Sequence, residues 1–274
     1  MCADRVPQNW TIPTDLSYNQ GMTLDQKIIW NQLVCDDQEQ AIAFYEALFG
    51  WTTKPEERKT YVHFYQGPDT VAGIMPQHGP SSGPSRWSVQ VGTTDIERYC
   101  ERAQAAGGKL LTPIMDIQYT GRLCSVKDPQ GGVLTAFQPL DTKRKEWGNR
   151  NEVGHFCWVE LLCQDLDKAI GFYTNVAGWE AHSMPVGDMT YHMLAPKGAG
   201  PMASIGGVMQ MPEAGVPDHF LPYVMVQDVD ASLAKAQSLG AQVCVQGTDI
   251  PGYGRFAVFA DPQGAALAVF QPKC

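Results

Sequence analysis

The sequence predicts an α+β fold of two tandem domains, each assembled from a pair of β-α-β-β-β units. The first observation is a duplication with a constant spacing of 128 positions: Trp30, Ala41, Ile42, Phe44, Tyr45, Gly50 and Trp51 recur as Trp158, Ala169, Ile170, Phe172, Tyr173, Gly178 and Trp179. The second is that Asp-Pro-Gln-Gly occurs at 128–131 and again at 261–264. The third is bulk composition, since 274 residues with 44% apolar and 18% charged side chains suit two globular domains.

The first domain is expected over residues 26–140, after an irregular N-terminal arm at 1–25. A strand-like run at 28–34 precedes Asp36-Asp37, a good helix N-cap pair. Apolar residues then follow at helical spacing up to Gly50, which ends the helix. Short strands are expected near 51–53, 60–66 and 70–75, which completes one unit.

The same order then repeats along the chain. The second unit has an expected strand at 87–91, a helix at 95–106 ended by two glycines, and strands at 109–113, 122–127 and 133–138. A charge-rich stretch at 141–152 is interpreted as a linker, and the second domain is expected over 153–274. Its first strand is expected at 155–162, and its helices are expected near 166–177 and 229–239. Each Asp-Pro-Gln-Gly lies between strand-like runs, which is typical of a turn.

Charge and cysteine usage limit the class of protein. The net charge is −9 and the basic residues form no cluster longer than 143–145, so a nucleic-acid partner is not expected. No apolar run has membrane-spanning length and the N-terminus shows no signal pattern, so no membrane association is expected. The eight cysteines contain no C-x-x-C pair, and they favour a reducing, cytoplasmic location.

Four β-α-β-β-β units with paired "F-Y-x-x-x-x-G-W" helix ends and "G-R" followed by "D-P-Q-G" resemble the vicinal oxygen chelate superfamily. That superfamily includes glyoxalase I, extradiol dioxygenases and fosfomycin- and bleomycin-resistance proteins, and the resemblance is to its tandem two-domain branch. It covers roughly residues 27–140 and 153–273 and implies that each pair of units curls into a half-open barrel around one pocket. It specifies the fold better than the reaction, because one fold hosts many chemistries.

The resemblance also implies where a metal would bind. Metal-dependent members carry His or Glu on the first strand of each unit and Glu on the last. Aligned on the helix ends and turns, these positions fall at or near Trp30, Trp87, Trp158, Pro222, Gly73, Thr135, Gly207 and Ala268. None of these residues ligates a divalent cation well, and the six histidines lack a spacing of two or four. We therefore expect neither a metal nor another cofactor.

One acid is expected inside a pocket. Strand alternation puts Glu160 on the same face as Trp158, where desolvation would raise its proton affinity and suit it to general acid/base catalysis. The alternative is a structural glutamate, neutralised by Arg255 or capping a neighbouring strand. The matching residue in the first half is Gln32, which cannot exchange protons, so the second half is the better candidate for chemistry.

A wider set of residues is expected to contact a ligand, and aromatic walls favour a flat organic molecule. The candidates are Trp30, Gln32, Tyr61, Trp87, Arg122, Trp158, Tyr191, His192 and Arg255. For the two arginines we favour structural ion pairs with Asp128 and Asp261, and each tryptophan has core packing as its alternative. His192 has the further alternative of pointing outward.

These observations predict a metal-independent enzyme of isomerase, lyase, cyclase or hydroxylase type acting on an aromatic or polyketide-like small molecule, with Glu160 as general acid/base. The first alternative is a non-catalytic binding or sequestering protein of the resistance type. The second is a metal-dependent glyoxalase or dioxygenase. The duplication already supplies the pairing that single-domain members obtain by dimerising, so a monomer or homodimer is expected.

Overall fold

The computed structural model describes residues 24–54, 61–77, 84–141, 150–186, 189–211 and 216–273. Most of the expected arm and linker, at 1–25 and 141–152, lies outside the described residues. The elements of the first half are β1 (Ile28–Cys35), α1 (Gln38–Phe49), β2 (Val62–Gln66), β3 (Asp69–Pro76), β4 (Arg86–Gly92), α2 (Ile96–Ala105), β5 (Lys109–Leu110), β6 (Met115–Ile117), β7 (Gly121–Lys127) and β8 (Val133–Pro139). Those of the second half are β9 (Phe156–Cys163), α3 (Leu166–Val176), β10 (Trp179–Val186), β11 (Met189–Pro196), the short 3-10 helix η3 (Pro201–Ala203), β12 (Gly206–Gln210), β13 (His219–Met225), α4 (Val229–Ser238), β14 (Gln242–Ile250), β15 (Gly254–Ala260) and β16 (Ala266–Pro272).

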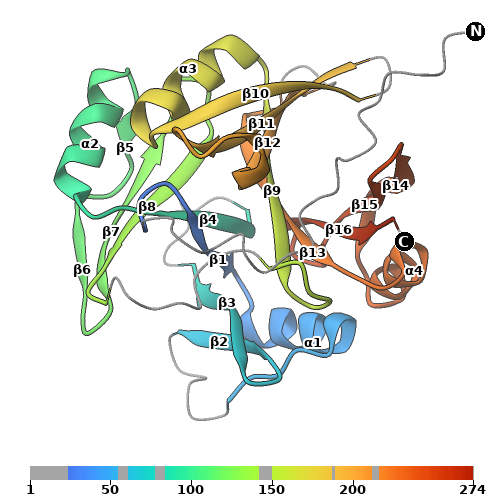
Figure 1. Ribbon diagram of the computed structural model, residues 1–274. Coiled ribbons are helices and arrows are strands. Elements are labelled where there is room, and N and C mark those ends of the chain that lie inside the picture. Colours follow the sequence, from blue (N-terminus) through green and yellow to red (C-terminus); the bar gives the residue numbers. More distant parts are fainter. Residues whose placement is uncertain are drawn as a thin grey trace, which may run out of the picture.

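Each half forms one curved, eight-stranded sheet (Figure 1). The first sheet has the order β2-β3-β1-β4-β8-β7-β5, with β6 beside β7, and the second has the order β10-β11-β12-β9-β13-β16-β15-β14. In the middle of each sheet the first strands of the two units pair antiparallel, β1 with β4 and β9 with β13. Each first strand also pairs in parallel with the last strand of its own unit. This is the predicted architecture of paired β-α-β-β-β units.

Two expected strands of the first half are shorter than predicted. The expected strand at 51–53 is a single bridge between Thr52 and Tyr65. The expected strand at 109–113 is reduced to β5, and Pro113, which has no N–H for a ladder, lies between β5 and the unpredicted β6.

The four helices begin in the same way. Asp37, Asp95, Asp165 and Asp228 each accept a hydrogen bond from the backbone N–H three residues later, at 2.9–3.1 Å. A side-chain oxygen at this position satisfies one of the N–H groups that a helix leaves unpaired, so these aspartates set where the helices start. Gly50 ends α1 with a φ of 73°, the left-handed conformation predicted for it.

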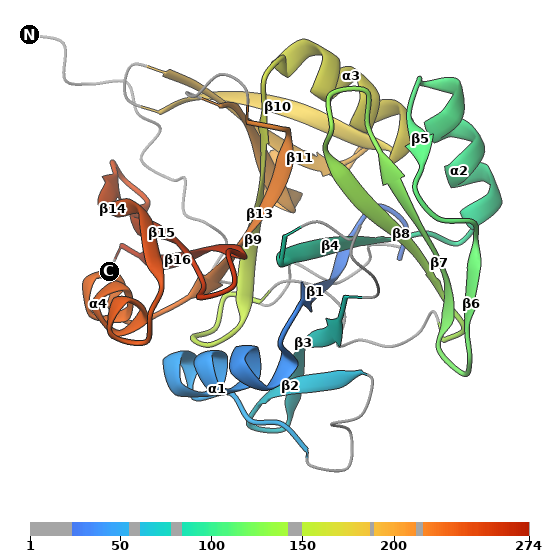
Figure 2. The ribbon, with the colours of Figure 1, turned by 180° about the vertical axis from the view of Figure 1, so that it is seen from behind.

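The hydrophobic cores cross the boundary between the halves. α1 packs against α4, and α2 packs against α3 (Figures 1 and 2). One core therefore joins Tyr45 and Trp51 to Leu233 and Phe259, while the other joins Tyr99 to residues of α3. Each helix also packs on strands of its own half, and a third cluster around Leu221 and Phe270 lies wholly in the second half.

The two Asp-Pro-Gln-Gly turns are tied down in the same crossed manner. Oδ1 of Asp128 accepts the backbone N–H groups of the next residues of its turn at 2.7–2.9 Å, and Oδ1 of Asp261 does so at 2.9 Å. Oδ2 of Asp128 accepts the hydroxyl of Tyr173 at 2.8 Å, and Oδ2 of Asp261 accepts that of Tyr45 at 2.9 Å. The prediction that these segments are structural turns is confirmed.

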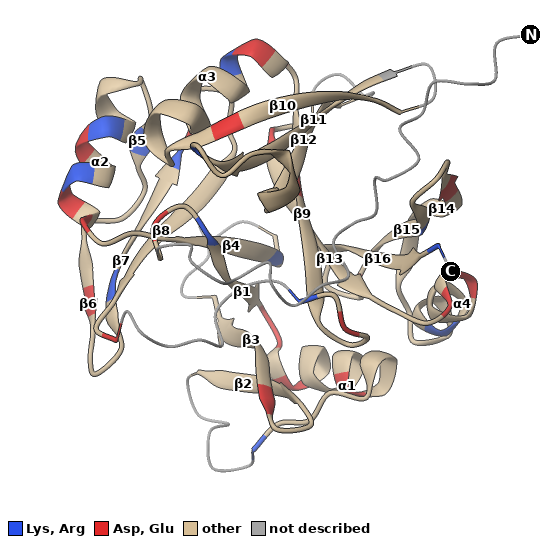
Figure 3. Ribbon diagram, in the orientation of Figure 1, with Lys and Arg blue, Asp and Glu red and all other residues tan. Residues whose placement is uncertain are grey.

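Charged residues of both signs are interleaved along the ribbon, as α2 shows clearly (Figure 3). Among the described residues, no helix has both the length and the apolar character needed to cross a membrane.

Candidate functional site

A cavity of about 410 Å³ lies on the second-half sheet. A cavity of this size accommodates a drug-sized molecule. Its floor comes from β9, β13 and β16, one wall from β10 and β11, and another from the turn between β14 and β15. The lining residues are Asn151, Cys157, Trp158, Glu160, Met184, Val186, Tyr191, Met193, Pro201, Met202, Ser204, Met209, Tyr223, Thr248, Asp249, Ile250, Pro251, Tyr253, Phe256 and Phe270.

Glu160 is the buried acid of this cavity and is only 3% exposed. The hydroxyl of Tyr191 donates to its Oε2 at 2.6 Å, and Nε1 of Trp158 donates to the hydroxyl oxygen of Tyr191 at 3.0 Å. The Tyr191 hydroxyl thus accepts from the indole N–H, which can only donate, and gives its own proton to the bond with Glu160. Oε2 is therefore an acceptor, and the proton of a neutral Glu160 resides on Oε1.

The other oxygen of this carboxyl group, Oε1, differs from Oε2 in its hydrogen bonding. Oε1 of Glu160 is buried and has no hydrogen-bond partner among the described residues. Burial raises the pKa of Glu160 to about 8, and the neighbouring Tyr191 hydroxyl and Trp158 indole N–H oppose that shift only in part. At neutral pH the side chain is thus mostly a carboxylic acid with an unused O–H donor.

A glycine makes room for this arrangement. A Cβ added at Gly207, which pairs with Glu160 across the parallel strands, would lie 1.8 Å from the Tyr191 hydroxyl oxygen. The first half repeats this feature, because a Cβ at Gly73 would lie 1.9 Å from the hydroxyl oxygen of Tyr61. A side chain at either glycine is incompatible with the adjacent Trp-Tyr pair.

The first half has the same Trp–Tyr hydrogen bond but no glutamate at the position that matches Glu160. Nε1 of Trp30 donates to the Tyr61 hydroxyl at 2.9 Å, as Trp158 does to Tyr191. The residue equivalent to Glu160 is Gln32, whose amide donates to Sδ of Met75 at 2.7 Å and accepts from Gln90 at 3.3 Å. Trp30, Gln32 and Tyr61 therefore come together as expected but do not line the second-half cavity.

The inner-strand positions do not fit the metal that the superfamily often carries. Strand register places Gln90 opposite Trp30 and Tyr223 opposite Trp158, where the alignment expected Trp87 and Pro222. Across the second-half sheet the central positions are then Trp158, Gly207, Tyr223 and Ala268. None of these four side chains is a carboxylate or an imidazole, and a single neighbouring carboxylate such as Glu160 falls short of the three protein ligands that catalytic metal sites use.

Trp87 is not a pocket residue, which corrects the expectation for it. It pairs with Leu33 across β1 and β4, so it lies on the face opposite to Gln32 and Ser88. It is 6% exposed, and its Nε1 donates to the hydroxyl of Tyr45 at 2.9 Å inside the core. The structural alternative therefore holds for this tryptophan.

His192, Arg122 and Arg255 were also expected to contact the ligand, and the structure places all three away from the cavity lining. His192 lies between two cavity residues on β11 and so faces the other side of the sheet, where its Nδ1 pairs with Ser183 Oγ at 3.0 Å. Arg122 pairs with Glu97, and Arg255 pairs with Asp230 and Asp249 at 2.8–3.2 Å. The arginines are structural, as favoured, but their partners are not the turn residues Asp128 and Asp261, whose oxygens accept from the turns and the tyrosines.

The sequence did not identify most of the cavity wall. Tyr223, Tyr253 and Phe256 line it, and all three come from the last unit of the chain, β13 to β16. Tyr253 stands in Gly252-Tyr253-Gly254, where Gly252 has a φ of 88° in the turn between β14 and β15. That glycine-flanked aromatic residue is the local pattern from which a wall-forming turn could have been predicted.

Two protein-family models match the chain, one in each half. The model described as Glyoxalase/Bleomycin resistance protein/Dioxygenase superfamily matches residues 27–137, and one described as Glyoxalase-like domain matches 158–270. CFP32 of Mycobacterium tuberculosis, provisionally named a glyoxylase, is 35% identical over 252 residues, covering 89% of this chain and 94% of its own. The anthracycline biosynthesis protein DnrV of Streptomyces peucetius is 28% identical, covering 88% and 92%.

Solved structures share the fold at low sequence identity. The 2,3-dioxygenase LapB from Pseudomonas sp. KL28 superposes with a TM-score of 0.62 at 15% identity, covering 92% of this chain and 94% of its own. The Mn(II)-bound glyoxalase from Novosphingobium aromaticivorans gives 0.61 at 14% identity, covering 91% and 83%. Likeness at this level of identity concerns the architecture alone.

Proposed function

The chain belongs to the glyoxalase/bleomycin resistance protein/dioxygenase superfamily, and within it we propose a metal-independent enzyme whose second half acts on an uncharged aromatic carbonyl compound. Glu160 is the proposed proton donor. The observation that carries this proposal is Glu160, which lines the apolar cavity and whose buried Oε1 has no hydrogen-bond partner among the described residues. A carbonyl oxygen is the group that such a donor would recognise.

The charge of the lining argues for an uncharged ligand. Among the described residues, no Lys, Arg or His lines the cavity, and of the two acids found there Asp249 is already paired with Arg255 at 2.8 Å. A carboxylate or phosphate would thus be buried without a counter-charge, which is strongly unfavourable. Aromatic and methionine side chains offer flat, polarisable contacts instead.

The relatives support the same class of ligand. DnrV and DauV are named for the biosynthesis of anthracyclines, which are fused-ring aromatic carbonyl compounds. A 28% identical relative over half of the chain is named lactoylglutathione lyase, but lactoylglutathione carries carboxylates, and no cationic side chain lines this cavity in the described part of the chain. We therefore prefer an aromatic ketone or quinone to a glutathione adduct.

The proposed chemistry begins with protonation. Glu160 transfers the proton from Oε1 to the bound carbonyl oxygen, and the Tyr191 hydroxyl stabilises the carboxylate that remains. That carboxylate then removes a proton from the carbon beside the carbonyl, so that the ketone becomes its enol and Glu160 regains its proton. Trp158 keeps the Tyr191 hydroxyl oriented for this task. Gln32 offers no acidic proton in the first half, so chemistry is assigned to the second half alone.

The ligand class is tested by measuring the binding of three matched probes through the change in Trp fluorescence. A neutral hydroxyanthraquinone should bind, while anthracene lacks the carbonyl and anthraquinone-2-carboxylate adds an anion. We expect both to bind at least about tenfold more weakly, since one lost hydrogen bond to a charged or acidic group corresponds to about 1.5 kcal/mol or more. Equal binding of all three would remove the support for Glu160 as the recognising group.

The apolar lining also favours a second candidate function, that of a non-catalytic binding or sequestering protein. Solvent-proton exchange separates the two. A hydroxyanthraquinone bearing a side-chain ketone is incubated with the protein in D₂O, and deuterium uptake beside the carbonyl is followed by mass spectrometry. An enzyme accelerates the uptake and Glu160→Gln abolishes it while retaining binding; a sequestering protein binds the probe without exchange.

A further inference from the structure

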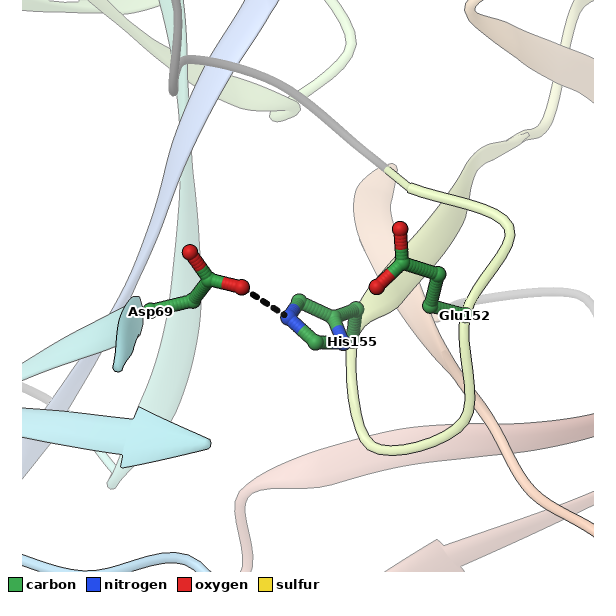
Figure 4. Close-up of side chains that lie close together, drawn as sticks. All are labelled: Asp69, Glu152 and His155. Atoms are coloured by element: carbon green, nitrogen blue, oxygen red, sulfur yellow. Dashed lines mark ion pairs between the residues drawn. The ribbon is translucent and has the colours of Figure 1, made fainter. Parts of the chain in front are cut away.

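A histidine and two carboxylates lie close together where the two halves of the chain meet. Asp69 begins β3 of the first half, while Glu152 and His155 precede β9 of the second. One potential ligand atom from each lies within 4.8 Å of the others. Figure 4 shows Asp69 facing Nε2 of His155, with the Glu152 carboxylate turned toward the same imidazole.

His155 is the unusual member of this cluster. Its side chain is buried, with the residue only 7% exposed, yet neither ring nitrogen has a hydrogen-bond partner among the described residues. Buried polar atoms in folded proteins are nearly always satisfied by protein, water or a bound ion. Both ring nitrogens of His155 therefore lack, among the described residues, the hydrogen-bond partner that a buried imidazole ordinarily has.

The distance between His155 and Asp69 suits a shared ion better than a direct bond. Nε2 of His155 lies 3.5 Å from Oδ2 of Asp69, which is too long for a good hydrogen bond. Two ligands of one tetrahedral Zn²⁺, each bound at about 2.0–2.2 Å, are separated by roughly 3.4 Å. We propose that Asp69, Glu152 and His155 form a binding site for a divalent transition-metal ion of the Zn²⁺ class.

Arg150 is the competing cation in this region. Its Nη1 pairs with the same Oδ2 of Asp69 at 2.8 Å. Carboxylates that ligate a metal commonly accept a second hydrogen bond of this kind, which orients them. The guanidinium also repels a divalent ion, so removing its charge should strengthen metal binding.

The site is separate from the proposed catalytic cavity, because none of its three ligands lines that cavity. It joins the β2–β3 hairpin of the first half to the segment that enters β9 of the second. The bound ion would therefore link the two halves and stabilise the folded state. A metal found in the purified protein would not by itself indicate metal-dependent chemistry at Glu160.

The test is titration of chelator-treated, untagged full-length protein with ZnCl₂, followed by calorimetry and thermal unfolding. Wild type should bind one Zn²⁺ and unfold at a higher temperature when it is bound. Loss of a group that merely supports a ligand lowers metal affinity by roughly 10–100-fold, so His155→Gln should lower it by about 100-fold or more. Glu152→Gln, at an exposed residue, should weaken binding without disturbing folding, and Arg150→Gln should tighten binding.

The matched control is His182→Gln. His182 and Glu180, 2.9 Å apart, form the other histidine–carboxylate pair among the described residues. Unchanged zinc affinity in this variant is expected. The proposal is overturned if wild type binds no zinc, if affinity is lost in His182→Gln instead, or if Glu152→Gln binds zinc as wild type does. Should His155→Gln not fold, the Glu152 and Arg150 variants still decide the outcome.

Discussion

The hydroxyl of Tyr45 donates a 2.9 Å hydrogen bond to Oδ2 of Asp261, 216 positions further along the chain. Tyr173 and Asp128 repeat this bond at 2.8 Å with the roles of the halves exchanged. Both bonds are buried, and each joins a helix of one half to a turn of the other. The duplicated sequence thus uses its repeated tyrosine and aspartate to hold the halves to each other.

Tyr45→Phe should therefore destabilise the whole protein. The change removes the hydroxyl and leaves Oδ2 of Asp261 without its donor, and an unsatisfied buried acceptor costs about 1–3 kcal/mol. Urea unfolding followed by circular dichroism measures the loss. Tyr119→Phe is the control, because that side chain is 88% exposed and should change the free energy of unfolding by less than about 0.5 kcal/mol. Equal effects of the two changes would contradict the role given to Tyr45.

The crossed cores predict that neither half folds alone. Residues 24–141 and 150–273, produced separately, should lack near-ultraviolet circular dichroism, because each exposes a helix face that the other half buries. Mixing the two fragments should restore the signal. A fragment that unfolds cooperatively by itself would show that one sheet and its own helices suffice.

Much of this architecture followed from periodicity and repetition, but the location of the cores did not. Strand and helix patterns are local, and they predicted all four helices together with most strands. Which helix packs on which is a contact between distant segments. The repeated tyrosines and aspartates are visible in the sequence, but nothing local indicates that each tyrosine pairs with the aspartate of the other half.

The candidate site was also predictable only where a local pattern decides the position of a residue. Glu160 was expected beside Trp158 because alternation on a single strand decides it, and the structure puts both residues in one cavity. Trp87 was placed by an alignment that ran three residues out of register, although its phase matches Val89 and Val91, which are buried in the core. Tyr223 and Tyr253 reach the cavity from other strands, and strand order is not encoded in local pattern.

Glu160 should make the stability of the protein depend on pH. Its folded-state pKa of about 8 lies above the ordinary value of 4.5, so the folded state holds the proton more tightly than the unfolded state. The stabilisation is complete below about pH 4.5 and is lost as pH rises to about 8, by up to about 1.4 kcal/mol per pH unit. Urea unfolding of wild type and Glu160→Gln across this range isolates the contribution as their difference. A difference that does not change with pH would mean that Glu160 is ionised in the folded protein.

Ligand affinity should follow the same titration. Binding of a neutral hydroxyanthraquinone should weaken as pH rises through about 8, because ionised Glu160 can no longer donate from Oε1. Glu160→Gln keeps an N–H donor at this place and should bind the probe with little dependence on pH. Fluorescence titrations at pH 6 to 9.5 measure both, provided that the probe itself keeps one charge state over this range. A wild-type affinity that stays constant would contradict donation by Glu160.

Gly73 and Gly207 lie against the hydroxyl groups of Tyr61 and Tyr191, and they provide a matched pair of substitutions. Gly207→Ala should displace Tyr191 and weaken probe binding, because the new Cβ would lie 1.8 Å from its hydroxyl oxygen. Gly73→Ala should displace Tyr61 in the same way and cost similar stability. If the second-half cavity alone binds the ligand, only Gly207→Ala lowers affinity. Equal losses in fluorescence titrations would assign ligand binding to both halves.

The crossed cores also close the four units into a ring, in which sheet contacts alternate with helix contacts. One half alone would need a second copy to close the same ring, and joining the halves in one chain makes that encounter intramolecular. Fusion also freed the copies from identity, so one could keep a carboxyl group where the other carries an amide.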